Sequence, residues 1–146
     1  MLFRSMTATI QTQIEFTDER IRSLLCSAFE GGFAASWALI EDYKFPEGIT
    51  LEDFQEGGRL TTTEYHPSYL LIPFHPGCSI IISDETEAGE EDAKRGELNI
   101  ETMKKGLQLM ATKYPHHFAD FVKENDDAIT GDVFLQLCLF DDIIYG

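Results

Sequence analysis

Residues 99–139 read NIETMKKGLQLMATKYPHHFADFVKENDDAITGDVFLQLCL, and the pattern of this stretch predicts helices along most of its length. Asn99 has a side chain that can cap a helix over residues 100–113, in which apolar residues recur at helical spacing. Pro115 suits the first turn of a second helix, over residues 116–124, because the N–H group that proline lacks is not needed there.

A third helix is predicted through residues 133–139, where apolar residues dominate. Either Thr130 or Asp127 can cap it, since both side chains accept hydrogen bonds from the free N–H groups of a first turn. Helices at the C-terminal end leave the strands to the residues before 99. This order of elements is typical of an α+β domain rather than of an alternating α/β fold.

Residues 7–16 alternate between apolar and polar side chains, at the period of two expected of a half-buried strand. Thr17 then offers an N-cap, and the acidic residues after it suit the positive end of a helix dipole. Apolar residues continue at helical spacing up to Gly31 and Gly32, a pair typical of a helix end. We therefore expect a first strand followed by a helix.

Four further segments have the composition or alternation of strands, and turn residues separate them. The predicted strands cover residues 37–45, 59–65, 69–74 and 79–83. Residues 84–92 carry six acidic residues in nine, and like charges this dense predict a solvated loop between the strands and the helices.

The pattern as a whole predicts an α+β fold with a mostly antiparallel sheet, one helix after the first strand, and three C-terminal helices packed on one face. With 146 residues, of which 43% are hydrophobic, the chain has the usual size of one domain with a real core. Residues 1–5 precede a second methionine and differ from the patterned sequence after them. We expect them to be a non-native leader and residues 6–146 to form the domain.

Charge restricts the classes of partner. The 26 acidic and 11 basic residues give a net charge of −15, which repels nucleic acid phosphates and anionic membrane surfaces and attracts a basic protein surface. Strong acidity also serves solubility alone. Cys26, Cys78 and Cys138 stand in apolar contexts, as expected of buried thiols in a reducing cytoplasm, and no apolar run has the length of a membrane span.

The sequence contains no motif of metal binding, phosphate binding or nucleophilic catalysis, and we expect neither a metal nor a cofactor. His116 and His117 are adjacent in a first helical turn, so their side chains point in different directions and one of them can line a cleft. Residues 124–127, Glu-Asn-Asp-Asp, lack the spacing of a calcium loop, and helix capping explains their carboxylates.

Five segments together resemble a family of small proteins from bacteriophages and prophages. They are Glu30-Gly-Gly32, Gly106-Leu-Gln-Leu-Met110, Tyr114-Pro-His-His-Phe-Ala-Asp-Phe121, Glu124-Asn-Asp-Asp-Ala128 and Thr130-Gly-Asp-Val-Phe-Leu-Gln-Leu-Cys138. The resemblance covers nearly everything from Met6 onward and brings no activity with it. It implies a phage origin and the host cytoplasm, where small accessory phage proteins often occlude a host defence protein or sequester a nucleotide signal.

A candidate ligand site follows the first predicted helix. Gly31 and Gly32 permit close approach of the backbone to a ligand, and the flat rings of Trp37 and Tyr43 can stack on a base. The structural alternative is that the glycines only end a helix and that Trp37 belongs to the core.

Cations near this segment can offset the charge of phosphates, because guanidinium suits bidentate phosphate recognition. The nearby cations are Arg20, Arg22, Lys44 and Arg59. His116 is a further candidate residue of the ligand site. The first hypothesis is therefore a counter-defence protein, expected to be a homo-oligomer, that binds and sequesters a small nucleotide-derived host signal such as a cyclic nucleotide or an ADP-ribose derivative.

Two further hypotheses belong to other classes. An acidic inhibitor would occupy a basic surface of a host defence complex by mimicking phosphate charge, and the loop over residues 84–92 would then matter. An enzyme would destroy the signal with His116 or His117 as general acid or base, near a carboxylate such as Asp120 or Asp126.

Overall fold

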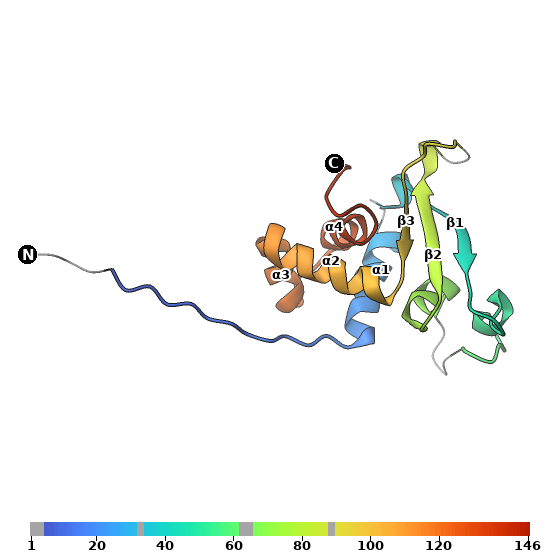
Figure 1. Cartoon of the computed structure of the whole chain (residues 1–146), viewed down its shortest axis with the longest axis horizontal. Coiled ribbons are helices and arrows are strands. Elements are labelled where there is room, and N and C mark those ends of the chain that lie inside the picture. The colour runs from blue at the N-terminus through green and yellow to red at the C-terminus, as the bar shows by residue number, and fades with distance from the viewer. Residues whose placement is uncertain (1–4, 32–33, 62–65, 88–89) are drawn as a thin grey trace, which may run out of the picture.

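The computed structural model describes residues 5–31, 34–61, 66–87 and 90–146, in which a layer of helices lies beside a small sheet (Figure 1). The strands are β1 (Ala38–Lys44), β2 (Ser79–Asp84) and β3 (Arg95–Leu98), and the α-helices are α1 (Asp18–Glu30), α2 (Ile100–Lys113), α3 (Pro115–Val122) and α4 (Ala128–Phe140). Short 3-10 helices cover Ala34–Ser36, Leu51–Phe54, Ser68–Leu70, Ile72–Phe74 and Glu85–Glu87. The predicted α+β class, with three C-terminal helices packed against an antiparallel sheet, is confirmed.

The sheet has the strand order β1-β2-β3, and both pairs of strands are antiparallel. Ile80 pairs with Leu98 and Ile82 with Gly96, so these four residues share one face. Ile80, Ile82 and Leu98 are fully buried, and a Cβ at Gly96 would come within 2.6 Å of Leu139 in α4. This face is the one that the helices cover, and the opposite face lies on the side away from them (Figure 1).

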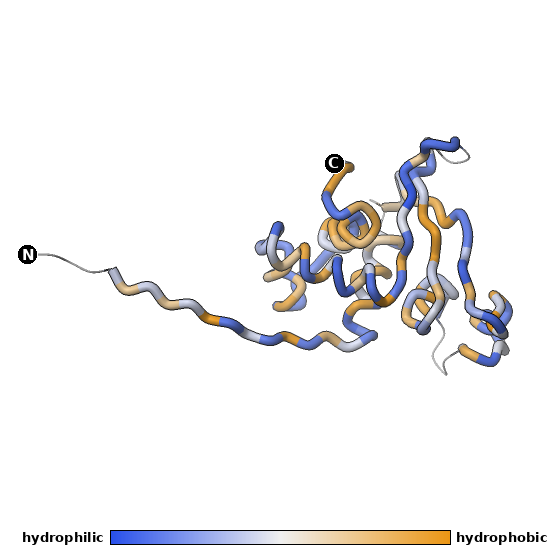
Figure 2. Tube along the Cα trace, in the orientation of Figure 1, coloured by the Kyte–Doolittle hydropathy of each residue, from blue (hydrophilic) through white to orange (hydrophobic). Residues whose placement is uncertain are grey.

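Helix α4 forms the centre of the helical layer. Every residue from Thr130 to Leu139 except Asp132 is buried, as expected of a helix that is apolar all round, and Figure 2 shows α4 and β2 among the hydrophobic segments. Glycines let the neighbours approach: a Cβ at Gly131 would lie 2.7 Å from the α1 backbone, and one at Gly106 would lie 2.4 Å from Cys138 Sγ. No helix in the described part of the chain is both long and apolar enough to cross a membrane.

The predicted helix starts agree with the structure. Thr17 caps α1 and Asn99 caps α2, each by accepting a hydrogen bond from a backbone N–H of the first turn. The cap of α4 is Asp127, because its carboxylate accepts hydrogen bonds from the backbone N–H groups of Ile129 and Thr130. Thr130 itself lies inside the first turn and is buried.

The strand predicted over residues 7–16 is wrong. This segment is extended but has no strand assignment, and Ile10 is 82% exposed. Alternation at a period of two marks a chain that can pair, but a strand forms only where a neighbour supplies the hydrogen bonds. Helix α1 therefore precedes the sheet and does not follow its first strand.

Two other strand predictions, over residues 37–45 and 79–83, are confirmed by β1 and β2. Residues 69–74 instead form the end of one 3-10 helix, a turn at residue 71 and a second 3-10 helix. Pro73 also lacks the N–H group that a strand ladder requires. For the strand predicted over residues 59–65, residues 59 and 60 belong to a turn, and residues 62–65 lie outside the described residues.

Strand β3 is not predicted by the sequence pattern. Its four residues, Arg-Gly-Glu-Leu, include a glycine and two charged residues, all of them poor strand formers. Pairing with β2 and packing of Gly96 against α4 form the strand despite its composition. Tertiary contacts override local propensity here.

Replacement of Gly131 by alanine is expected to destabilise the fold, because the new Cβ would meet the backbone of α1, which cannot move aside as a side chain can. Overpacking of this kind costs about 2 kcal/mol, which lowers the melting temperature of a domain of this size by about 4–8 °C. Thr112→Ala, at an exposed position of α2, is the control and should leave the melting temperature nearly unchanged. Thermal unfolding followed by circular dichroism distinguishes the two variants, and an unchanged melting temperature for Gly131→Ala would contradict the close packing of α1 on α4.

Candidate functional site

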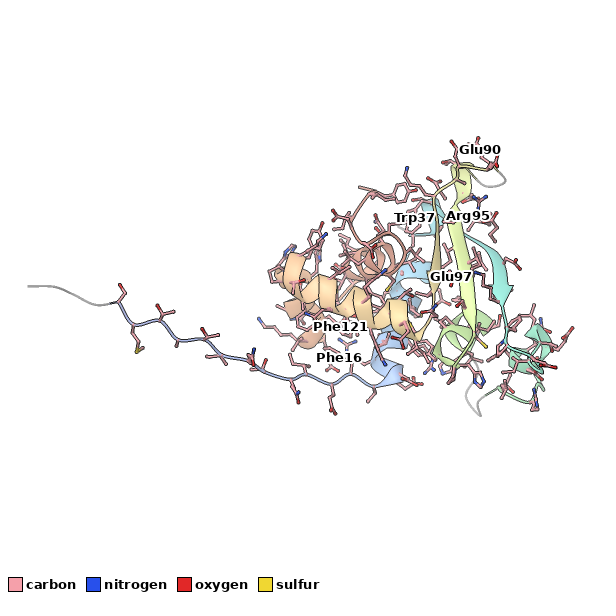
Figure 3. All side chains as sticks on the ribbon, in the orientation of Figure 1. Phe16, Trp37, Glu90, Arg95, Glu97 and Phe121 are labelled. Carbon is pink, nitrogen blue, oxygen red and sulfur yellow. The ribbon has the colours of Figure 1, made fainter. Side chains whose placement is uncertain are left out.

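Exposed carboxylates gather where β2 turns into β3, at the end of the sheet that carries Glu90 in Figure 3. Glu90, Glu91 and Asp92 are exposed in this loop, and Glu41 and Asp42 are exposed on the neighbouring strand β1. We call these five residues the acidic site.

Arg95, the first residue of β3, holds the acidic site together. Its guanidinium forms a bidentate ion pair with Glu41, with Nε donating to Oε2 at 2.7 Å and Nη2 donating to Oε1 at 3.2 Å. The same guanidinium donates to the backbone carbonyls of Glu90 at 2.8 Å and of Ala93 at 3.3 Å. The Arg95 side chain therefore connects the loop to β1. A bidentate ion pair of this kind is stronger than a single hydrogen bond and also fixes the relative orientation of the two side chains.

A β-bulge places Glu41 within reach of Arg95. The pairing of β1 with β2 shifts register between Ile40 and Asp42, which leaves Glu41 as the extra residue. Bulges redirect the side chain of the extra residue. As a result Glu41 and Asp42 are both exposed and border a shallow groove of about 580 Å³ on the side of the sheet away from the helices.

Within the acidic site, Arg95 favours the charged form of Glu41. The hydrogen bond from Arg95 lowers the pKa of Glu41 below its ordinary value. The contacts from Arg95 to the loop go to backbone carbonyls and not to the carboxylates of Glu90, Glu91 or Asp92. The guanidinium therefore holds the loop backbone, pairs with Glu41 and interacts electrostatically with Asp92, while the loop carboxylates are exposed.

Most basic side chains in the described part of the chain form ion pairs with carboxylates of the same chain. Ion pairs to carboxylates hold eight of the protein's 11 basic residues. These eight are Arg20, Arg22, Lys44, Arg59, Arg95, Lys104, Lys105 and Lys113. A phosphate that approached any of them would have to compete with a carboxylate already in place.

The two arginines of the predicted ligand site have structural partners. Arg20 donates to the Phe121 carbonyl and pairs with Asp126, and its guanidinium lies 4.4 Å from the centre of the Phe121 ring. Arg59 pairs with Asp53 and donates to the carbonyl of Gly48. The structure does not bring Arg20 and Arg59 together.

Gly31 and Tyr43 belong to other contacts than those of Arg20. Gly31 ends α1, and a Cβ there would come within 2.4 Å of the Ala128 side chain, so helix packing alone accounts for this glycine. Gly31 lies eleven residues after Arg20 along α1, roughly 16 Å at the rise of a helix. Gly32 lies outside the described residues. Tyr43 is half-buried on β1 and stacks on Phe45, with ring centres 5.9 Å apart.

Trp37, a predicted site residue, borders a cavity with polar groups. It is 5% exposed, its Nε1 donates to Asp132 at 2.8 Å, and its ring stacks on Tyr145 with centres 4.8 Å apart. Asp132 and His117 line the same cavity of about 300 Å³. Burial raises the pKa of Asp132, although hydrogen bonds from Trp37 and Gln136 lower it in part.

The C-terminal segment covers Trp37, a feature that no local sequence signal predicts. Gln136 is fully buried, and its Oε1 accepts the backbone N–H groups of Ile144 and Tyr145 at 2.8 Å each. Tyr145 then donates its hydroxyl to Asp84 at 2.5 Å, at the end of β2. The stacking face that Trp37 would offer to a base is therefore occupied by Tyr145.

One of the two predicted carboxylate partners of the histidine pair, Asp120, interacts electrostatically with His117. The rings of His116 and His117 lie 4.0 Å apart. Burial, and then the neighbouring His116, lowers the pKa of His117, so its imidazole is neutral at pH 7. Asp126 pairs with Arg20. Among the described residues, no group of three or more His, Cys, Asp or Glu side chains is arranged to hold a metal ion.

The three cysteines are free thiols in settings that suppress reactivity. The hydrogen bond to Glu30 raises the pKa of Cys26 to about 11, and burial raises the pKa of Cys78 and of Cys138. Because the thiolate is the nucleophilic form, none of these side chains is poised for nucleophilic catalysis.

Comparison with known proteins gives no match: no family model, no curated protein and no solved structure is similar to this chain. The sequence does place six acidic residues in the loop over residues 84–92. The contribution of Arg95 and Glu41, 54 residues apart, follows only from the folded structure.

Asp132 and Asp142 are expected to give opposite pH dependences of stability. The pKa of Asp132 is raised by burial, so wild type loses stability relative to Asp132→Asn as the pH rises from about 3.9 through the folded pKa. The pKa of Asp142 is lowered by a hydrogen bond from Tyr114, so its contribution is complete above about pH 3.9 and is lost as the pH falls below it.

Urea unfolding of wild type, Asp132→Asn and Asp142→Asn between about pH 3 and pH 7 measures these differences. The difference in unfolding free energy between wild type and each variant should change with opposite slopes. Equal slopes for the two variants would contradict the burial of Asp132 beside Trp37.

Proposed function

We propose that the protein binds a basic surface of a partner macromolecule through the acidic site. The observation that carries the proposal is the set of contacts of Arg95, which fastens a loop of exposed carboxylates to β1 through Glu41 and through backbone carbonyls. Because Arg95 holds the backbone of residues 90–93, the exposed carboxylates of this segment lose less conformational entropy on binding than those of a free segment, and this raises affinity.

The distribution of charge supports this proposal. Eight cations are neutralised by internal ion pairs, so the net charge of −15 is expressed mainly through exposed carboxylates. An excess of one sign on a surface steers a partner of opposite charge and speeds association, in a manner that salt weakens.

The resemblance to phage proteins gives the proposal a biological setting. A basic surface that normally holds nucleic acid, within a host defence complex, is the kind of partner that an acidic phage protein would occupy. Carboxylates would stand in for phosphates on that surface, and the protein would compete with nucleic acid for it.

Sequestration of a nucleotide signal stays a prediction. Its candidate residues Arg20, Arg59 and Trp37 have partners within the fold, and the cavity beside Trp37 presents the carboxylate of Asp132, which repels phosphate. These contacts favour the acidic surface over the small-molecule pocket.

Neutralising the loop should weaken binding to a cationic probe. In the triple variant Glu90→Gln, Glu91→Gln and Asp92→Asn, affinity for a fluorescent oligoarginine peptide is expected to fall at least about tenfold at 0.1 M salt, because three positioned charges are lost. Fluorescence anisotropy measures the dissociation constant across a range of salt concentrations.

The matched control removes the same charge from another exposed region, with Glu47→Gln, Glu52→Gln and Glu56→Gln. This variant should change the dissociation constant less than about threefold. Equal losses in the two variants would show that net charge alone attracts the peptide and would contradict a localised site.

A further inference from the structure

The N-terminal arm, residues 5–16, leaves the body of the molecule as an extended chain (Figure 1). Its apolar side chains are among the most exposed of the protein: Met6 is 92% exposed, Ile10 is 82% exposed and Ile14 is 49% exposed. Apolar side chains grouped in this way on a surface mark an interaction site.

The arm has two distinct faces, because successive side chains of an extended chain point in opposite directions. One face carries Met6, Ala8, Ile10, Thr12, Ile14 and Phe16. The other face is polar, with threonine, glutamine and one glutamate. No charged residue occurs from Ser5 to Ile14, in a protein with a net charge of −15.

An apolar groove of about 470 Å³ begins where the arm joins the body. Ile14 and Phe16 line one end of the groove, and Met103, Leu107 and Ala111 of α2 line its side. Phe16 is held in place, since its ring centre lies 4.6 Å from that of Phe121, the neighbour labelled in Figure 3. The remainder of the arm points away from the groove.

The arm is poorly suited to fold back into its own groove. Residues 5–16 contain no glycine, proline, asparagine or aspartate, the residues that most readily reverse a chain. Threonine and isoleucine, which favour extended backbone, occupy five of the positions from Thr7 to Ile14. Ile10 is therefore exposed in the single chain, where a groove on another molecule can reach it.

We propose that two copies of this chain exchange their N-terminal arms, so that the apolar face of each arm fills the α2 side of the groove on the other copy. The exchange is symmetric, with the same two surfaces used by both subunits. Ten residues of extended chain span roughly 33 Å, and the α2 stripe from Met103 to Ala111 is roughly 12 Å long, so the arm has ample reach.

Charge favours this mode of association over direct contact between bodies. Two bodies of like charge repel one another, whereas the arm is uncharged as far as Ile14. In the groove wall, Lys104 is the exposed cation beside the apolar stripe, at 4.0 Å from Glu101. Arm exchange joins the subunits and leaves the acidic sites apart from the interface.

Sedimentation analysis of the full chain over a range of concentrations tests the proposal. Wild type is expected to be a dimer. Ile10→Asp should weaken dimerisation at least about a hundredfold, because two buried isoleucines are lost per dimer. Gln11→Asp, which adds the same charge to the polar face, is the control and should remain a dimer.

Ile10 is exposed in the single chain, so its replacement leaves the fold of the body intact. A wild type that is monomeric at all concentrations, or an Ile10→Asp variant that dimerises as strongly as Gln11→Asp, overturns the proposal.

Disulfide trapping tests the location of the arm. One population carries Ile10→Cys and the other carries Gln108→Cys, at an exposed position in the groove, and both carry Cys26→Ser to remove the half-exposed native thiol. Oxidation of the mixture should give a cross-linked heterodimer as the main product. A dimer that forms without this cross-link would place the arm elsewhere and contradict the exchange.

Discussion

The burial of α4 on every side is the constraint on which the rest of the structure depends. A helix that is apolar all round needs neighbours in each direction, and this chain supplies α1, α2 and β3. Each neighbour meets α4 at a glycine, namely Gly131 facing α1, Gly106 facing Cys138, and Gly96 facing Leu139. The position of β3, and with it the position of Arg95, follows from this packing.

The polar groups of α4 connect the core to the acidic site. Gln136 is fully buried, and its amide is satisfied by the backbone of the C-terminal segment, which positions Tyr145 over Trp37 and against Asp84. Asp84 ends β2, where the acidic loop starts. Asp84 is therefore tied to the core through Tyr145, and the backbone of residues 90–93 is held by Arg95.

Helical periodicity and capping residues predicted α1, α2, α3 and α4 almost to their ends, because these signals lie within a few neighbouring residues. The strand predictions were less reliable, since a strand also needs a partner: residues 7–16 alternate without finding one, and Arg95–Leu98 pairs despite a weak pattern. The sequence identified the acidic loop but not its attachment, because the contact of Arg95 with Glu41 spans 54 residues. The sequence did not predict that Arg20 pairs with Asp126, because that contact forms between residues far apart in the chain.

We propose that the acidic site, rather than the net charge of the whole protein, contacts a basic partner. The most direct test of this proposal is a titration of isotopically labelled protein with an oligoarginine peptide, followed by backbone amide chemical shifts. We expect the largest shifts to cluster at Glu41, Asp42 and residues 90–95 on the side of the sheet away from the helices. Shifts of similar size at distant exposed acids such as Glu47 and Glu101, or shifts centred on the cavity beside Trp37, would contradict it.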